Sequence, residues 1–179
     1  MAEPASTLEG VRDHQRGWVS RLASRAFVVL LFLICVAGGT GLLGGRTSTA
    51  TAEGVGKGYR MVLSYPHTAR PGLDAFWELE VVHAGGFHGP ITLAVTGSYF
   101  DLFETQGYYP TPSSTTRDGT YVYMTFTPPP GGDTFKVMFD SYVQPYVEPS
   151  HLLAQPATVI LLKHGQRLDA IHFSTWLFP

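Results

Sequence analysis

The sequence contains no asparagine and only one cysteine, Cys35, among its 179 residues. Without asparagine there is no acceptor for N-linked glycosylation. With a single thiol no disulfide can form within the chain, so the stability of a folded domain must come from burial of its core. Because that thiol lies inside a long apolar run, nucleophilic cysteine chemistry is excluded, as is a blue-copper site, which needs a thiolate ligand.

The motifs of several enzyme classes are also missing. There is no Gly-x-Ser-x-Gly elbow, no phosphate-binding glycine loop and no His-Glu-x-x-His sequence. The carboxylates of Glu78 and Glu80 are spaced to share one face of a strand, which is typical of a solvated face. We therefore expect that the protein is not an enzyme and needs no cofactor.

The chain has few charged residues and a small negative net charge. Charged residues make up 15% of the chain and aromatic residues 13%, which indicates a core-forming protein rather than a disordered one. From Tyr59 to Pro179 there are six Lys/Arg against ten Asp/Glu, a net charge of −4. Binding of nucleic acid needs clustered cations, so we expect no nucleic-acid partner.

One stretch, Ala26 to Gly45, runs for twenty residues without a charge. A helix of that length spans about 30 Å, the thickness of the hydrocarbon core of a bilayer. The run is longer than the roughly 7–15 apolar residues of a secretory signal, so we expect an uncleaved transmembrane helix in the lipid bilayer. The alternative is export after cleavage near Ala52, because Ala50-Thr51-Ala52 has the small-x-small pattern of a cleavage site.

Basic residues flank this run unequally. Four precede it and three follow it closely: Arg12, Arg16, Arg21 and Arg25, then Arg46, Lys57 and Arg60. Positively charged flanks stay in the cytoplasm. We therefore expect a single-pass protein of the plasma membrane, with residues 1–25 as a cytoplasmic tail and the C-terminal domain outside the cytoplasm.

The remainder of the chain has the pattern of an all-β protein. Residues 46–58 are small and polar, which predicts a flexible stalk before a domain at 59–179. Short runs rich in Val, Thr, Phe and Tyr then alternate with Gly and Pro. They predict eight strands: Tyr59–Tyr65, Asp74–His83, Pro90–Thr96, Tyr99–Phe103, Thr120–Phe126, Thr134–Val143, Ala157–Leu162 and Arg167–Thr175.

Alternation within these runs predicts an antiparallel sandwich of immunoglobulin type, with Trp77 buried at its centre. Three segments between Pro71 and Thr134 carry a resemblance: Pro-Gly-x-x-x-Phe-Trp-Glu-Leu-Glu-Val, Gly-Pro-Ile-Thr-Leu-Ala-Val and Phe-Thr-Pro-Pro-Pro-Gly-Gly-Asp-Thr. This layout resembles immunoglobulin-like modules of bacterial membrane-anchored or exported proteins. The resemblance implies the fold and a surface location, and it transfers no catalytic or binding residues.

Histidines offer one candidate site. His83 and His88 flank the predicted hairpin between the second and third strands. Two imidazoles joined by a carboxylate can hold Zn²⁺ or Cu²⁺. The alternative is that both are ordinary polar residues beside a turn.

Aromatic residues offer the other candidate. Tyr108 and Tyr109 lie in a predicted sixteen-residue loop, Glu104 to Gly119, and Trp176 and Phe178 lie at the C-terminal end. Tyrosine suits partner recognition, and consecutive apolar residues cannot all point inward from one strand. We expect these four residues to contact a membrane-embedded protein, as part of a binding accessory to a membrane complex. For the tyrosines, the alternatives are a carbohydrate-binding loop and rings that fold back onto the core. For the C-terminal residues, the alternatives are contact with the domain's own loops and contact with a lipid surface.

Overall fold

The computed structural model describes residues 18–40, 45–54, 58–146 and 154–178. The chain divides into two compact units, Met1–Gly44 and Gly45–Pro179. Residues 1–17, which make up most of the expected cytoplasmic tail, lie outside the described residues.

The first unit contains the helix α1 (Trp18–Gly39), whose 22 residues are long and apolar enough to cross a membrane. It starts earlier than the expected span at 26–45, because the residues before Ala26 include good helix formers such as Leu22 and Arg25. It ends at Gly38 and Gly39, where glycine weakens the helix. Residues 41–44 of the expected span lie outside the described residues.

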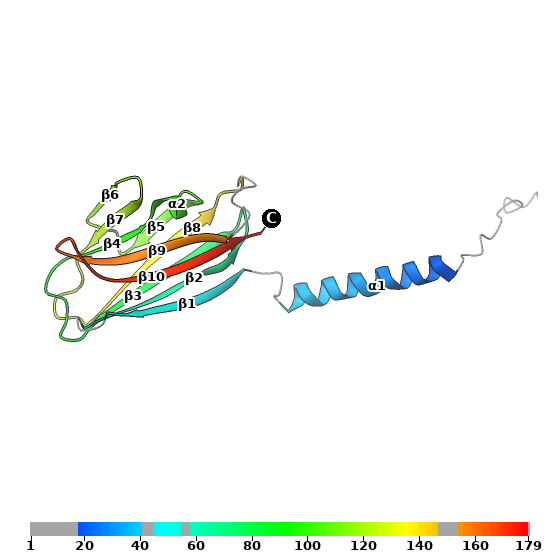
Figure 1. Ribbon diagram of the computed structural model, residues 1–179, viewed down its shortest axis with the longest axis horizontal. Coiled ribbons are helices and arrows are strands. Elements are labelled where there is room, and N and C mark those ends of the chain that lie inside the picture. Colours follow the sequence, from blue (N-terminus) through cyan, green and yellow to red (C-terminus); the bar gives the residue numbers. More distant parts are fainter. Residues whose placement is uncertain (1–17, 41–44, 55–57, 147–153, 179) are drawn as a thin grey trace, which may run out of the picture. The chain divides into compact units, whose positions relative to one another are not determined.

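The second unit is an all-β domain, as the sequence predicts. Its described residues form ten strands and one short helix (Figure 1). The elements are β1 (Arg46–Glu53), β2 (Tyr59–Ala69), β3 (Asp74–His83), β4 (Ile91–Thr96), α2 (Gly97–Phe100), β5 (Phe103–Tyr109), β6 (Ser114–Arg117), β7 (Tyr121–Phe126), β8 (Thr134–Val143), β9 (Ala154–Lys163) and β10 (Gln166–Leu177).

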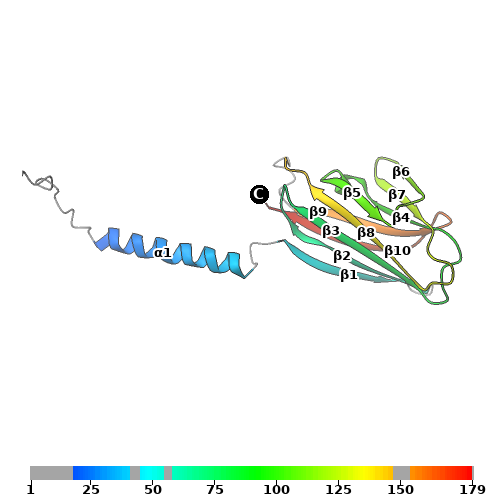
Figure 2. The same ribbon diagram turned by 180° about the vertical axis from the view of Figure 1, so that it is seen from behind.

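Hydrogen bonds join these strands into one curled sheet. One antiparallel group contains β5, β8, β3, β2 and β1, and the other contains β10, β9, β4, β7 and β6. The groups are connected where β2 and β10 run parallel, with Thr68 beside Trp176 and Ala69 beside Leu177. Figure 2 shows the same arrangement from behind, with β1 and β6 on opposite sides of the domain. Two separate sheets, as expected for a sandwich, are replaced by this continuous one.

One hydrophobic core lies between the two groups. Phe126 of β7 and Phe135 of β8 belong to different groups, yet their ring centroids are 5.5 Å apart. Trp77 of β3 is only 2% exposed and meets the ring of Phe139 edge-on, which confirms its predicted place in the core. The sheet therefore curls so that the inner faces of both groups pack on each other.

The predicted flexible stalk is wrong for residues 46–53. This segment forms β1, which pairs with β2 from Arg46 beside Thr68 to Glu53 beside Arg60. Its threonines face outward, whereas Ala50 and Ala52 pack against the core. The strand was missed because its side chains are small and mostly polar, and its half-buried residues are only Ser48, Ala50 and Ala52. Residues 55–57 of the expected stalk lie outside the described residues.

Two further expectations need correction. The predicted strand Tyr99–Phe103 begins instead as the short helix α2, which precedes β5. The predicted loop 104–119 contains most of β5 and all of β6, so the described strands number ten rather than eight. Tyr108 and Tyr109 therefore lie on a strand that pairs with β8.

Candidate functional site

The two tyrosines of β5 point to opposite faces of the sheet. The Tyr108 ring stacks on Phe139, with centroids 5.0 Å apart, and packs against the hydrophobic core. Tyr109 is 58% exposed. Tyr108 therefore folds back onto the core, which was the alternative prediction for the tyrosines. Of the two, only Tyr109 is available to a partner.

Tyr109 belongs to an apolar patch on the outer face of the first strand group. It lies beside Met138 in the register of β5 and β8, and Phe76 of β3 lies diagonally across from Met138. All three side chains are exposed. We call Phe76, Met138 and Tyr109 the outer patch. The carboxylates of Glu78 and Asp140 lie next to it, because they pair with Met138 and Phe76 in the β3–β8 register.

Trp176 and Phe178 lie elsewhere. Both point outward from the end of β10, at 41% and 47% exposure, and their rings stack with centroids 6.4 Å apart. Leu177 between them is fully buried. In the sheet, β8, β3 and β2 separate β10 from β5, so the four aromatic residues predicted from the sequence do not form one surface.

A shallow pocket of about 190 Å³ opens where β1 and β3 begin and β2 ends. Its lining includes Leu73, Arg46 and Arg70. It also includes Asp74 and Phe76, so the pocket borders the outer patch at Phe76. Leu73 is 55% exposed. Sequence reasoning missed these residues because they come from three separate strand ends, and no local pattern marks their proximity.

The aromatic pair lies beside this pocket. Thr68 and Ala69 also line it. Thr68 pairs with Trp176, and the backbone N–H of Phe178 donates to the carbonyl oxygen of Ala69 at 3.0 Å. Figure 1 places the end of β10 at the same end of the domain as the start of β1. We call Leu73, Trp176 and Phe178, together with Arg46 and Arg70, the end surface.

The two histidines predicted to bind metal do not flank a hairpin. β3 pairs with β2 and β8 while β4 pairs with β7 and β9, so the connection between β3 and β4 crosses from one strand group to the other. The His83 ring stacks on Tyr59 at 4.0 Å and its Nδ1 donates to the carbonyl oxygen of Gly86. His88 is exposed. Among the described residues, no three His, Cys, Asp or Glu side chains could hold a metal.

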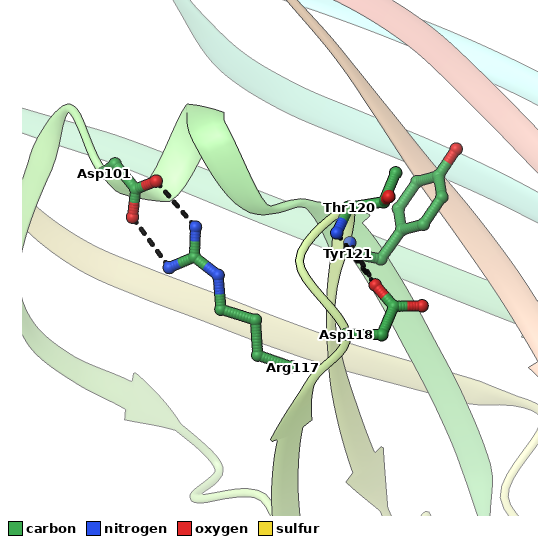
Figure 3. A network of polar contacts seen from close by, with 5 residues as sticks. All are labelled: Asp101, Arg117, Asp118, Thr120 and Tyr121. Carbon is green, nitrogen blue, oxygen red and sulfur yellow. Dashed lines mark hydrogen bonds and ion pairs between the residues drawn. The ribbon is translucent and has the colours of Figure 1, made fainter.

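A polar network ties α2 to the hairpin of β6 and β7 (Figure 3). The Arg117 guanidinium makes two hydrogen bonds to the Asp101 carboxylate, at 2.7 and 2.6 Å, and lowers the pKa of that carboxyl group. Asp118 accepts the backbone N–H groups of Tyr121 and Thr120 and the hydroxyl of Tyr123. These hydrogen bonds lower the pKa of Asp118, and the bond from the backbone of Tyr121 has the largest effect. Both carboxylates thus serve the fold.

A second polar chain is buried near the junction of the two strand groups. The Thr175 hydroxyl donates to the carbonyl oxygen of Pro66 at 2.7 Å and lies 3.0 Å from the Tyr99 hydroxyl. Because Thr175 has a single hydroxyl proton, Tyr99 must donate to it. Burial raises the pKa of Tyr99, which keeps its hydroxyl protonated. This chain links α2, β10 and β2.

Comparison with known proteins identifies no family. No protein-family model matches the chain, and no curated protein matches it. A DNA glycosylase, AlkC of Pseudomonas fluorescens bound to DNA with an abasic site analog, aligns with 62% of the chain at 13% identity and a TM-score of 0.31. A β-glucosidase of Listeria innocua in complex with isofagomine aligns with 75% at 8% identity and a TM-score of 0.31. The chain covers only 28% and 17% of these two proteins.

Proposed function

We propose that this chain is a single-pass protein of the plasma membrane whose β domain lies outside the cytoplasm and binds a membrane-embedded protein as an accessory subunit. In this proposal α1 is the membrane span. The excess of arginine before Ala26 supports a cytoplasmic N-terminus. We further propose that the β domain is immunoglobulin-like, supported by its two antiparallel strand groups and by the single core that contains Trp77.

The observation that carries the binding role is the outer patch. Phe76, Met138 and Tyr109 come from three neighbouring strands and are exposed together on one face. Contiguous exposed apolar side chains with polar neighbours are typical of protein interaction sites. Glu78 and Asp140 beside the patch supply a polar rim.

Co-purification of the full-length protein in mild detergent tests this proposal. Tyr109→Ser combined with Met138→Lys should abolish recovery of the partner without lowering the melting temperature, since both side chains are exposed. Tyr121→Ser is the matched control, because Tyr121 faces outward from β7 in the other strand group. Equal recovery of the partner by the double variant and the control would refute the role of the patch.

The orientation has its own test. A reporter that is active only outside the cytoplasm, fused after Pro179, should be active, and the same reporter fused before Met1 should be silent. The reverse pattern would place the β domain in the cytoplasm and remove the proposed location.

A further inference from the structure

We propose that the end surface docks on the phospholipid headgroup region of the same membrane that α1 crosses, an inference that rests on the proposed membrane span. The outer patch would then be held at a fixed height above the bilayer. The two surfaces meet at Phe76, which also lines the pocket, and they would have different tasks. The end surface would position the domain, and the outer patch would bind the partner protein.

The first argument is the chemistry of the end surface. Trp176 and Phe178 present stacked rings to solvent, and Leu73 adds an exposed aliphatic side chain. Tryptophan is enriched where a protein meets the membrane–water interface, because its ring is apolar while its N–H group stays hydrated. The combination therefore suits the boundary between headgroups and acyl chains.

Two arginines complete the surface. Arg46 and Arg70 line the pocket next to Leu73. Within the described residues neither guanidinium has an ion-pair partner, although Asp74 also lines the pocket. A guanidinium binds phosphate oxygens with paired hydrogen bonds and is attracted to anionic lipids. The outer patch has a different balance of charge: its neighbours in register are the carboxylates of Glu78 and Asp140, with Lys136 3.6 Å from Glu78.

The second argument is the length of the connecting chain. Only residues 40–45 separate the last residue of α1, Gly39, from the first residue of β1, Arg46. Even fully extended, this connection spans at most about 25 Å. The opposite end of the domain, at Gln166 where β10 begins, lies about 33 Å along that strand from Trp176. The connection is therefore too short for the domain to stand inverted, with the opposite end on the bilayer and the start of β1 farthest from it. A membrane-spanning α1 holds the start of β1, which borders the end surface, within about 25 Å of the bilayer.

Quenching of tryptophan fluorescence by brominated lipid tests the proposal directly. The full chain carrying Trp18→Phe is reconstituted into phosphatidylcholine/phosphatidylglycerol vesicles that contain no other protein. Trp77 and Trp176 then remain, and Trp77 is an internal control because it is buried in the core. Lipid brominated high on its acyl chains should quench part of the emission, and Trp176→Phe in the same background should abolish that quenching. Unquenched Trp176 would overturn the proposal.

Spin labels provide a second measurement that does not depend on tryptophan. In a Cys35→Ser background, a label at Leu73→Cys should become accessible to oxygen and protected from a water-soluble nickel reagent when the chain is in vesicles. A label at Gln166→Cys, which is exposed at the opposite end, should behave as in water. Equal behaviour of the two labels would overturn the docking.

The outcomes separate this inference from the proposed function. A chain that floats with the vesicles but leaves Trp176 unquenched retains the membrane span and loses the docking. A chain that does not float with the vesicles refutes both the membrane span and the docking. If Trp176→Ser with Phe178→Ser abolishes recovery of the partner while Trp176 stays unquenched in vesicles, the end surface is a protein interface and lipid docking is refuted.

Discussion

The ring of Tyr108 stacks on that of Phe139 at an interplanar angle of 22°, whereas Tyr109, its neighbour in the chain, points to the solvent-exposed face. Tyr108→Ala should therefore lower the free energy of unfolding by about 2–3 kcal/mol, below the value for a fully buried ring. Tyr109→Ala should change it by about 0.5 kcal/mol or less. Chemical denaturation of both variants measures the difference, and equal losses would contradict the opposed faces.

Trp77 and Glu78 provide the same comparison on β3. Trp77 is buried against Phe139, so Trp77→Ala should cost about 3–5 kcal/mol of stability. Glu78 faces outward near Lys136, at 3.6 Å, and Glu78→Ala should shift stability by only about 0.5 kcal/mol. Urea unfolding would report both values. A large loss for Glu78→Ala would mean that the outer face is covered.

The buried chain from Tyr99 through Thr175 to Pro66 predicts a non-additive pair of variants. Thr175→Val leaves the Tyr99 hydroxyl and the Pro66 carbonyl without partners and should cost about 1–3 kcal/mol. Tyr99→Phe keeps the bond to Pro66 and should cost about 1 kcal/mol. The double variant should be no less stable than Thr175→Val alone, because no buried tyrosine hydroxyl remains unpaired. Strictly additive losses would disprove the coupling.

Acid should weaken the hairpin of β6 and β7. The pKa values of Asp101 and Asp118 are lowered in the folded protein, so each carboxylate stabilises the fold above its unfolded pKa of about 4. That contribution is lost as the pH falls through the lower, folded values. Asp118→Asn should reduce the melting temperature at neutral pH and approach the wild type in strong acid. Asp140→Asn, at an exposed position on β8, controls for the loss of a surface carboxylate. A deficit of Asp118→Asn that is the same at neutral and acid pH would contradict the prediction.

The alternation of apolar and polar residues along the chain predicted those strands whose inward side chains are large. The predicted bounds of Asp74–His83 and Thr134–Val143 coincide with β3 and β8, because Trp, Leu, Val and Phe alternate there with polar residues. β5 escaped prediction because its register shifts between Thr105 and Gly107, which breaks the alternation. β1 escaped because its inward residues include alanines, which carry little hydrophobic signature.

The candidate surfaces were predictable only in part. Alternation around Leu177 correctly separates Trp176 and Phe178, which point outward, from the residue between them. By contrast, Met138 lies beside Tyr109 because of the order of the strands in the sheet. Leu73 lies near Arg46 and Arg70 because the ends of three strands meet there. Both arrangements depend on long-range pairing. Sequence spacing carries no information about such pairing.

The pairing of β1 with β2 also bears on how the protein could be processed. A peptidase that cut after Ala52 would remove all of β1 except Glu53, together with the contacts of Ala50 and Ala52 with the core. The released domain would display the unpaired edge of β2, from Arg60 to Thr68, as a template for another chain. Cleavage at this position would therefore yield an aggregation-prone fragment, whereas retention of β1 keeps α1 and the complete folded domain in one chain.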